Sequence, residues 1–535
     1  MSPSIPQSSP ESLAHRLPAK ALRPAVRIAL ASFAGSALLA SAVSPAAAQV
    51  FGPGPDDPAL FDTVINLPED RPSISGSVGN DSGDLTPTTQ LNVASGGSVG
   101  RLFNAFSGSE VNISGGSVNP AFNAFPGSEV NISGGSVGPA FNARTGSEVN
   151  ISGGVIGRGF NAESGSDVEL IGGEFILNGV PYSGSTITLG DDDVFTGTLS
   201  DGSAFVFSPL VADTLSGVTL TAAPLPAPVT TLQTVTTDLS GGLSGLRAGQ
   251  ELTLQAGGVL RDNFAVVDAT LNIQDGVVGS GVEAARGKVT ISGGSVGDDF
   301  EAFSGSVVTI SGGSVGDAFE AFSGSVVTIS GGSVGDAFDA NAGSEVTISS
   351  GNVGRFFAAL SGSKVTISGG SVSIFLSAFS GSEVTISGGS VGIGFNAFSG
   401  SLVNISGGSV GSVVAHSDSV VTISGGSVGG RFEVEASSEV NLLGTEFFLN
   451  GLLLDELMPG ETLTISDRDV TLSGILADGS PFSFDLNSTN QRGAYFFDPG
   501  ATVTVTLVEL IVPEPSALAL LLPGGATLVR RRRRV

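Results

Sequence analysis

The stretch that decides the fold is SGSVVTISGGSVGDAFEAF, residues 304–322, because the chain repeats it almost unchanged from Ser323 onward. The repeat has a period of 19 residues, with single-residue slips near Ile113, Ile291 and Ile423. Periods of this size are typical of solenoids, propellers and other repeat arrays. The isoleucine of its ISGG box falls at Ile113, Ile132 and Ile151 in a first array and at Ile291, Ile310, Ile329, Ile348, Ile367, Ile386, Ile405 and Ile423 in a second.

One repeat, residues 107–125, shows how each unit should fold. Val111 and Ile113 flank the polar Asn112, which is the period of two expected of a strand with one buried face. The pair Gly115-Gly116 supplies a tight turn at a place where a Cβ atom would clash. The side chains expected to point inward are Val111, Ile113, Val118 and Phe122, with Ala124 leaving room beside the phenylalanine.

A single unit of this size cannot offset the entropy lost on ordering its backbone, so each coil must stack on its neighbours. The sequence therefore predicts an all-β protein, a parallel β-helix (β-solenoid) in two related halves. The inward residues are spaced two, five and four apart, and not six apart as in a left-handed hexapeptide helix. This spacing favours a right-handed helix, which resembles those of adhesins and pectin-lyase-like proteins.

The chain is also duplicated on a larger scale. EFILNG (174–179) recurs as EFFLNG (446–451), and GTLSDGSAFVF (197–207) recurs as GILADGSPFSF (474–484). Each array is thus expected to end in the same β-rich module, which would cap the open edge of the last coil.

The N-terminal segment has the three parts of a secretory signal peptide. Residues 1–27 carry the basic side chains, an apolar run follows from Ile28 to Ala40, and Ala46 and Ala48 form an A-x-A cleavage site. We expect cleavage after Ala48, and hence export. The alternative is a buried helix.

The C-terminal segment has three ordered elements: the motif Val512, Pro513, Glu514, Pro515, Ser516, an apolar run from Ala517 to Val529, and the arginines Arg530, Arg531, Arg532, Arg533 and Arg534. This arrangement resembles the PEP-CTERM sorting signal. The resemblance implies an exosortase-type sorting enzyme as a partner, and a location in the cell envelope, at the cell surface or in the extracellular polysaccharide matrix.

The physical properties of this tail suit a transient insertion into the inner membrane. Its apolar run is shorter than the roughly 20 residues that a stable span needs, and the arginines would stay on the cytoplasmic side. A nucleic-acid patch is the alternative for the arginines, but an exported chain would not meet nucleic acid. The expected domains are a signal peptide (1–48), an N-terminal cap or entry segment (49–92), a first array (93–173), a first capping module with linker (174–262), a second array (263–443), a second capping module (444–511) and the sorting tail (512–535).

Composition excludes some kinds of site. The 535-residue chain has no cysteine, so it has neither disulfides nor thiolate metal sites. Its formal charge of −28 would repel nucleic acid and attract divalent cations.

An acidic row is the one candidate cation site. Glu110, Glu129, Glu148 and Asp167 recur at the repeat spacing, so stacking would place their carboxylates about 4.8 Å apart. Two interpretations stay open: a solvated edge that aids solubility, or bridging by Ca²⁺, which accepts six to eight oxygen ligands in loose geometry. Apart from that calcium, no cofactor and no metal site is predicted.

A second polar row consists mainly of threonine in the second array and of asparagine in the first. Such rows can bind regular surfaces such as glycan chains or ice, although they are more often polar residues on a solvent face. The NIS sequons at the asparagines are interpreted as a by-product of the repeat. The row comprises Thr290, Thr309, Thr328, Thr347, Thr366, Thr385, Asn404 and Thr422, with Asn112, Asn131 and Asn150 in the first array.

Catalytic residues are not predicted. Beyond the signal peptide His416 is the one histidine, and it lies at a slipped coil, where it is expected to be a filler. Arg101, Arg158, Arg355 and Arg431 are scattered among coils. The sequence therefore predicts a non-enzymatic, exported structural or adhesive protein of the cell envelope or exopolysaccharide matrix. The alternative is a polysaccharide-binding or polysaccharide-cleaving (lyase-like) β-helix.

Overall fold

The computed structural model describes residues 63–75, 77–78, 89–228, 235–239, 243–489 and 495–509. All of them belong to the larger of two compact units, residues 46–535. The predicted cleavage residues Ala46 and Ala48 lie outside the described residues, as do the tail residues Val512–Ser516 and Arg530–Arg534.

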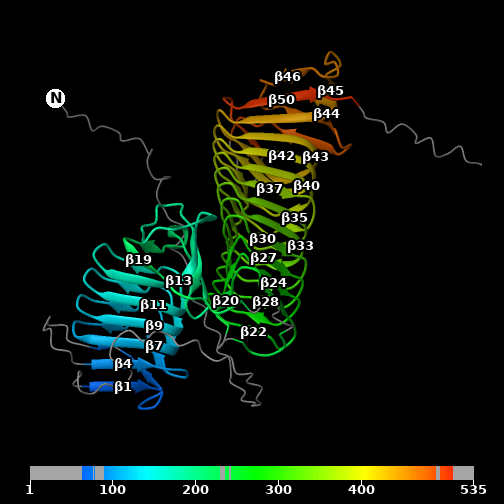
Figure 1. Cartoon of the computed structure of the whole chain (residues 1–535). Coiled ribbons are helices and arrows are strands. Elements are labelled where there is room, and N and C mark those ends of the chain that lie inside the picture. Colours follow the sequence, from blue (N-terminus) through cyan, green and yellow to red (C-terminus); the bar gives the residue numbers. More distant parts are fainter. Residues whose placement is uncertain are drawn as a thin grey trace, which may run out of the picture. The chain divides into compact units, whose positions relative to one another are not determined.

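The predicted fold is confirmed: the protein is all-β and forms a parallel β-solenoid of about 18 turns over residues 89–442 (Figure 1). A coil of the second array contains three short strands, for example β30 (Val307–Ile310), β31 (Ser314–Val315) and β32 (Glu320–Ala321). Each strand pairs in parallel with the equivalent strand of the coil before it. Among the described residues, one short 3-10 helix interrupts the strands, η2 (Pro209–Val211).

The longest strand of most coils contains the recurring VxI pattern, which reads LNV in β4 and LNI in β24. In the first array these strands are β4 (Thr89–Val93), β7 (Ser109–Val118), β9 (Glu129–Val137) and β11 (Glu148–Ile156). In the second they are β24 (Thr270–Ile273), β27 (Lys288–Ile291), β30, β33 (Val326–Val334), β35 (Glu345–Val353), β37 (Lys364–Ile367), β40 (Glu383–Val391), β42 (Leu402–Ala415) and β43 (Val420–Val434).

The strand register confirms the period and its slips. Ile113 pairs with Ile132, 19 residues later, whereas Val93 pairs with Ile113, and Ile405 with Ile423. In each half the stacking begins one coil before the first coil that the repeat pattern predicted. Here β1 (Thr63–Leu67) pairs with β4, and β21 (Glu251–Leu254) pairs with β24. These earlier strands were missed because their sequences keep the alternation of apolar residues but not the ISGG box.

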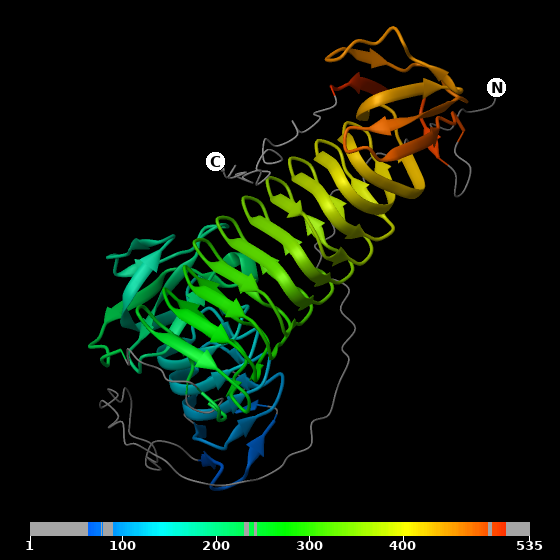
Figure 2. The same cartoon turned by 90° about the vertical axis from the view of Figure 1, so that its right-hand side faces the viewer.

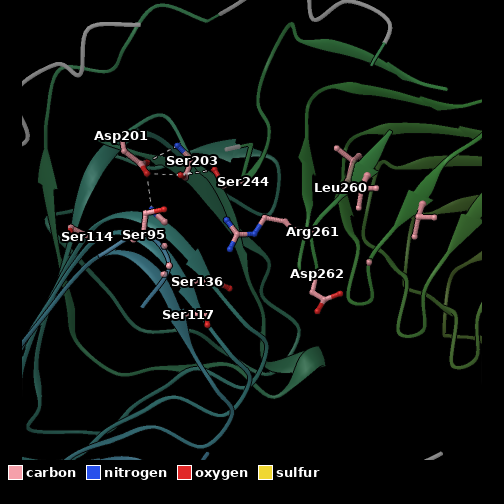
Figure 3. Close-up of a pocket in the computed structure, with 18 residues that line it drawn as sticks. Ser95, Ser114, Ser117, Ser136, Asp201, Ser203, Ser244, Leu260, Arg261 and Asp262 are labelled. Carbon is pink, nitrogen blue, oxygen red and sulfur yellow. Dashed lines mark hydrogen bonds between the residues drawn. The ribbon is translucent and has the colours of Figure 1, made fainter. Parts of the chain in front are cut away.

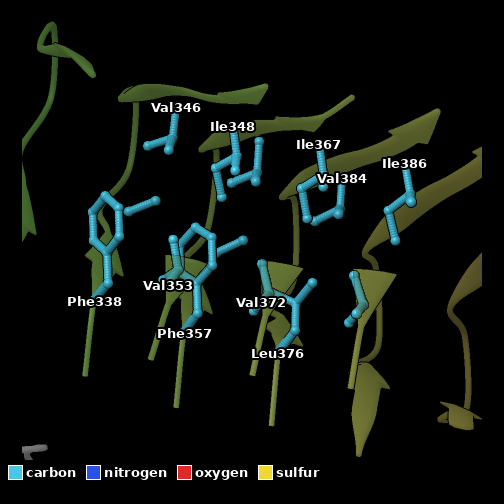
Figure 4. Packing of buried hydrophobic residues seen from close by; sticks show 14 of the residues in the cluster. Phe338, Val346, Ile348, Val353, Phe357, Ile367, Val372, Leu376, Val384 and Ile386 are labelled. Atoms are coloured by element: carbon cyan, nitrogen blue, oxygen red, sulfur yellow. The ribbon is translucent and has the colours of Figure 1, made fainter. Parts of the chain in front are cut away.

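The core consists of rows of equivalent side chains, one per coil. Val111, Ile113, Val118, Phe122 and Ala124, which the sequence predicted to point inward, are all buried, with at most 2% of any side chain exposed. Figure 4 shows the same rows in the second array, where the phenylalanines at 338 and 357 stack along one side of the core. Leu376 takes the place of the phenylalanine in one of these coils, so the row stays apolar where the aromatic ring is missing.

The turns between strands depend on glycine and serine. Gly116 has φ +64°, and a Cβ there would lie 2.4 Å from the carbonyl oxygen of Gly97 in the preceding coil, which confirms the predicted need for glycine. At the SGS turn the second serine is buried, and its hydroxyl donates to the carbonyl three residues earlier, as Ser109 does to Phe106 at 2.6 Å. The serine hydroxyl is therefore bonded within its own turn.

The two β-rich modules have the same strand topology. In the first, β13 (Asp167–Leu177) is followed by β14 (Val180–Pro181), β15 (Thr186–Ile187), β16 (Phe195–Leu199), β17 (Ala204–Phe207), β18 (Thr214–Leu215) and β19 (Val218–Ala222). In the second the order is β44 (Glu439–Leu449), β45 (Leu452–Leu453), β46 (Thr462–Thr464), β47 (Thr471–Leu476), β48 (Pro481–Asp485), β49 (Phe496–Phe497) and β50 (Thr502–Leu507).

Each module adds one further parallel strand to the solenoid and then covers it. β19 pairs in parallel with β13, and β15 pairs antiparallel with β19 on its other side. β50 and β46 repeat this arrangement beside β44, at the end of the second array in Figure 2. The described strands from 63 to 222 and those from 245 to 507 belong to different sheets, so hydrogen-bonded stacking does not continue from one half into the other. Among the described residues no helix is long and apolar enough to span a membrane.

Candidate functional site

The predicted acidic row is brought together by the stacking. Glu110, Glu129, Glu148 and Asp167 occupy equivalent positions of successive coils and pair in register. A shallow hollow of about 310 Å³ runs along Glu129, Glu148 and Asp167. Glu110 itself is buried, with 3% of its surface exposed.

A ladder of asparagines lies beside this row. The side-chain amide of Asn112 donates to Asn92 at 3.0 Å, that of Asn131 to Asn112 at 3.1 Å, and that of Asn150 to Asn131 at 3.0 Å. Asn112 and Asn131 also donate to the glutamates two residues earlier in the chain, Glu110 at 2.7 Å and Glu129 at 2.9 Å. Asn112, Asn131 and Asn150 thus have a structural role, in which they bond successive coils of the first array to one another.

The electrostatics of the row follow from burial and like charge. Burial raises the pKa of Glu148, and the neighbouring charges of Glu129, Asp167 and Glu169 raise it further, while the hydrogen bond with Asn150 lowers it. Among the residues that the structure describes, no group of three or more His, Cys, Asp or Glu side chains is arranged to hold a metal ion. Calcium bridging stays a prediction.

We expect Asn131→Ala to lower the free energy of unfolding of the first half by about 1–2 kcal/mol, because it removes hydrogen bonds to both neighbouring coils. Asn131→Asp should cost about 2–3 kcal/mol at neutral pH, because it also sets a second carboxylate beside Glu129. Urea denaturation of both variants at pH 7 measures these costs. If the two variants were equally stable, the ladder would have no electrostatic component.

The threonine row is also stacked as predicted, with Thr290 opposite Thr309 and Thr309 opposite Thr328. At another turn the structure shows an aspartate ladder that was not predicted from the sequence. The backbone N–H of Asp317 donates to the carboxylate of Asp298 at 2.9 Å, and that of Asp336 donates to Asp317 at 2.8 Å. The recurrence of Gly-Asp at the repeat spacing was the available signal.

Three of the scattered arginines are held in ion pairs. Arg355 contacts Asp336 at 2.6 Å, at the end of the aspartate ladder. Arg158 pairs with Glu301 and with Asp299, the latter at 3.0 Å, and Arg431 pairs with Glu433. Their positive charges are therefore used to neutralise carboxylates of the fold.

His416 continues an aromatic row. Its ring stacks on Phe398 with centroids 4.6 Å apart, and Phe398 stacks in turn on Phe379. Nδ1 lies 3.1 Å from Glu435 and Nε2 lies 3.3 Å from Asn396, so both ring nitrogens have polar neighbours.

Each module is clamped onto the last coil by one aspartate of its DGS motif. The carboxylate of Asp201 accepts hydrogen bonds from the backbone N–H of Gly154 at 2.7 Å and of Ser203 at 2.8 Å. Asp478 in the second module accepts the same bonds from Gly426 at 2.7 Å and Ser480 at 2.8 Å. Each aspartate packs against a glycine that leaves room for it. A Cβ at Gly153 would lie 2.5 Å from Cγ of Asp201, and a Cβ at Gly425 would lie 2.4 Å from Cγ of Asp478, so any larger residue would clash.

Asp201 also borders the pocket drawn in Figure 3, which has a volume of about 750 Å³. Serine hydroxyls and glycine backbone line much of it, and Arg261 and Asp262 line another side. Burial lowers the pKa of Arg261, against the opposing charge of Asp262. The Asp201 carboxylate is bonded to Ser203, whose hydroxyl is bonded to Ser244 at 2.7 Å, so the polar groups of this region serve the clamp.

The two clamps differ in burial, and their pKa values shift in opposite directions. Burial raises the pKa of Asp201 despite its hydrogen bonds. Burial also acts to raise the pKa of Asp478, but it is weaker there, and the hydrogen bonds from Ser480 and Gly426 bring that pKa below its ordinary value. A third carboxylate, Asp213, is fully enclosed in the first module, where burial raises its pKa to about 7 against the opposing effect of backbone N–H donors such as Ser208.

The modules should therefore respond to pH in opposite ways. Asp213 has a folded pKa above its unfolded value, so its contribution to stability is fully present below about pH 4 and is lost as the pH rises through 7, a change of about 4 kcal/mol. Asp478 has a lowered folded pKa, so its contribution is present at neutral pH and is lost as the pH falls below about 4.

Hydrogen exchange of the β19 and β50 amides at pH 7.5, 5 and 3, corrected for intrinsic exchange rates, measures both responses. Protection of β19 should rise between pH 7.5 and 5, and that of β50 should fall between pH 5 and 3. Asp213→Asn should flatten the first response and leave the second unchanged. Parallel changes in the two strands would contradict this assignment.

Comparisons of the chain with protein-family models, with curated proteins and with solved structures found no match.

Proposed function

We propose that the protein is a non-enzymatic, exported structural or adhesive component of the cell envelope or exopolysaccharide matrix. One observation carries the proposal: the repeated polar side chains bond to their equivalents in the next coil. The side-chain amide of Asn131 donates to that of Asn112, and the carboxylate of Asp298 accepts from the backbone N–H of its equivalent Asp317. Side chains used in this way make a rigid, regular surface.

The sequence of the two ends supports export and sorting. The signal-peptide pattern with Ala46 and Ala48 would direct the chain out of the cytoplasm. The PEP-CTERM-like motif around Glu514, with the apolar run and Arg530–Arg534, would hold it in the inner membrane until an exosortase-type enzyme acted on it.

The test is to recover the protein from the envelope and the matrix of its native cells and to determine both mature termini by mass spectrometry. A chain that begins at Gln49 and ends near Pro513–Ser516 supports export and sorting. An intact segment Arg530–Val535 on the envelope protein contradicts processing by a sorting enzyme.

A polysaccharide-binding β-helix is the second candidate, favoured by the in-register threonine row of the second array. A fixed affinity for one polysaccharide that is lost when Thr309 and Thr347 are replaced by lysine would support binding. Release of unsaturated sugar products would instead support a lyase.

A further inference from the structure

The second module exposes an apolar surface. Leu452, Leu453, Met458 and Leu463 expose 75%, 51%, 66% and 41% of their side chains. They lie on residues 452–464, which run from β45, the second strand of the β44–β45 hairpin, to β46, which pairs with β50. We call these four side chains the leucine hairpin surface.

Packing within the hairpin does not account for these four side chains. Leu454 and Leu457, from the same hairpin, are partly buried against the core of the second array, so they anchor it. The connection between β45 and β46 also has its own hydrogen bond, in which the backbone N–H of Met458 donates to the carboxylate of Glu461 at 3.0 Å. Leu453 and Leu463 line a hollow of about 530 Å³ together with Leu454 and Leu457, so this apolar surface is partly concave.

The first module lacks an equivalent surface. Its shorter hairpin has β14 in place of β45, and Val180 there exposes 64% of its side chain. By strand register the buried Ile187 of the first module corresponds to the buried Ile465, and the position of Leu463 beside Val505 is taken by Ser185 beside Leu220. Four residues (182–185) connect β14 to β15, whereas eight (454–461) connect β45 to β46, and Met458 lies on this longer connection. The two modules share a topology, so the fold does not require this surface.

The hairpin lies where the chain leaves the solenoid. β46 pairs with β50, the backbone N–H of Gly460 donates to Leu507 at 2.7 Å, and the described chain ends two residues later at Glu509. Seven residues (510–516) separate Glu509 from Ala517, where the apolar run begins, so this connection of eight Cα–Cα steps spans at most about 29 Å. If the apolar run is in a membrane, the hairpin is within reach of that membrane's surface.

We propose that the leucine hairpin surface contacts the interfacial zone of the lipid bilayer while the tail is inserted. Apolar side chains on amphipathic surfaces enter this zone, at the boundary between headgroups and acyl chains. The neighbouring Asp455, Glu456 and Glu461 are exposed and negatively charged, which favours a zwitterionic lipid surface over an anionic one. This inference rests on the proposed membrane insertion of the tail.

The absence of cysteine allows a direct test in the full chain. Leu453→Cys and Met458→Cys are each labelled with an environment-sensitive fluorophore, and Val180→Cys serves as the matched control in the first module. The labelled chains are reconstituted with phosphatidylcholine vesicles containing a lipid with a quencher in its acyl chain. Flotation of the vesicles reports insertion of the tail, and quenching reports contact of the hairpin.

We expect all three chains to float, with emission reduced roughly twofold or more at positions 453 and 458 and unchanged at 180. Flotation without quenching overturns the inference and leaves the proposed function in place. Failure to float counts against membrane insertion of the tail, and hence against both. A concentration-dependent emission shift in lipid-free solution overturns the inference in favour of a second copy of the chain.

Discussion

Phe338→Ala is expected to lower the free energy of unfolding of the second array by about 3–5 kcal/mol. Phe338 is 1% exposed and lies in a row of rings, with centroids 4.8 Å from those of Phe319 and Phe357. The truncation leaves a cavity that the coils on either side cannot fill without moving out of hydrogen-bonding register. Contacts on both faces of the ring are lost together.

The matched control is Phe375→Ala. Its ring also stacks on a neighbour, Phe356, with centroids 5.3 Å apart, but 41% of the side chain is exposed, so we expect a loss of less than about 1 kcal/mol. The chain's two tyrosines, Tyr182 and Tyr495, lie in different modules, and it has no tryptophan. Urea denaturation followed by tyrosine fluorescence in a Tyr182→Phe background therefore reports the second half. Equal losses in the two variants would show that burial in the aromatic row does not set the stability.

Asp201→Ala is expected to destabilise the first module by about 2–3 kcal/mol, whereas Asp478→Ala should cost the second module about 1 kcal/mol. Both substitutions remove the acceptor of two backbone N–H groups and one serine hydroxyl. In the first module these donors are in a part-buried site and are left unsatisfied. In the second the site is exposed, so water replaces the carboxylate.

Single-tyrosine chains measure the two costs separately, with Tyr182 reporting the first module and Tyr495 the second. Protection of β19 amides from hydrogen exchange should fall in Asp201→Ala, while that of the inner strand β9 should not. The clamp assignment would be wrong if Asp201→Ala left β19 as protected as in the unaltered chain.

The candidate surfaces were only partly predictable. The acidic row and the threonine row were found in the sequence because a repeat makes chemically equal residues recur at a fixed spacing. The aspartate ladder had the same signal in the Gly-Asp pairs before Phe319 and Phe338, but the hydrogen bond from one coil's backbone to the previous coil's carboxylate was not inferred. The spacing of the repeat shows that two residues will be neighbours. It does not show whether their backbone or their side-chain groups will form the hydrogen bond between them.

The leucine hairpin surface was not predicted either. In the sequence GLLLDELMPGETL (451–463), Leu452, Leu454 and Leu463 look alike as apolar residues. Which of them packs against the core depends on where β45 and β46 attach to β44 and β50. That attachment is a property of the folded module.

By itself the sequence determined the coil: its period, its slips at Ile113, Ile291 and Ile423, its buried positions such as Val111 and Phe122, and the duplication of the module. These features follow from contacts between nearest-neighbour coils, which recur every 19 residues and so leave a periodic trace. Only the tertiary structure decided how each array is closed. The clamp joins Asp201 to Gly154, 47 residues apart, in a contact that each half makes once. A contact without a repeat has no spacing to reveal it, and it forms only after the coils have stacked and supplied the surface on which the module packs.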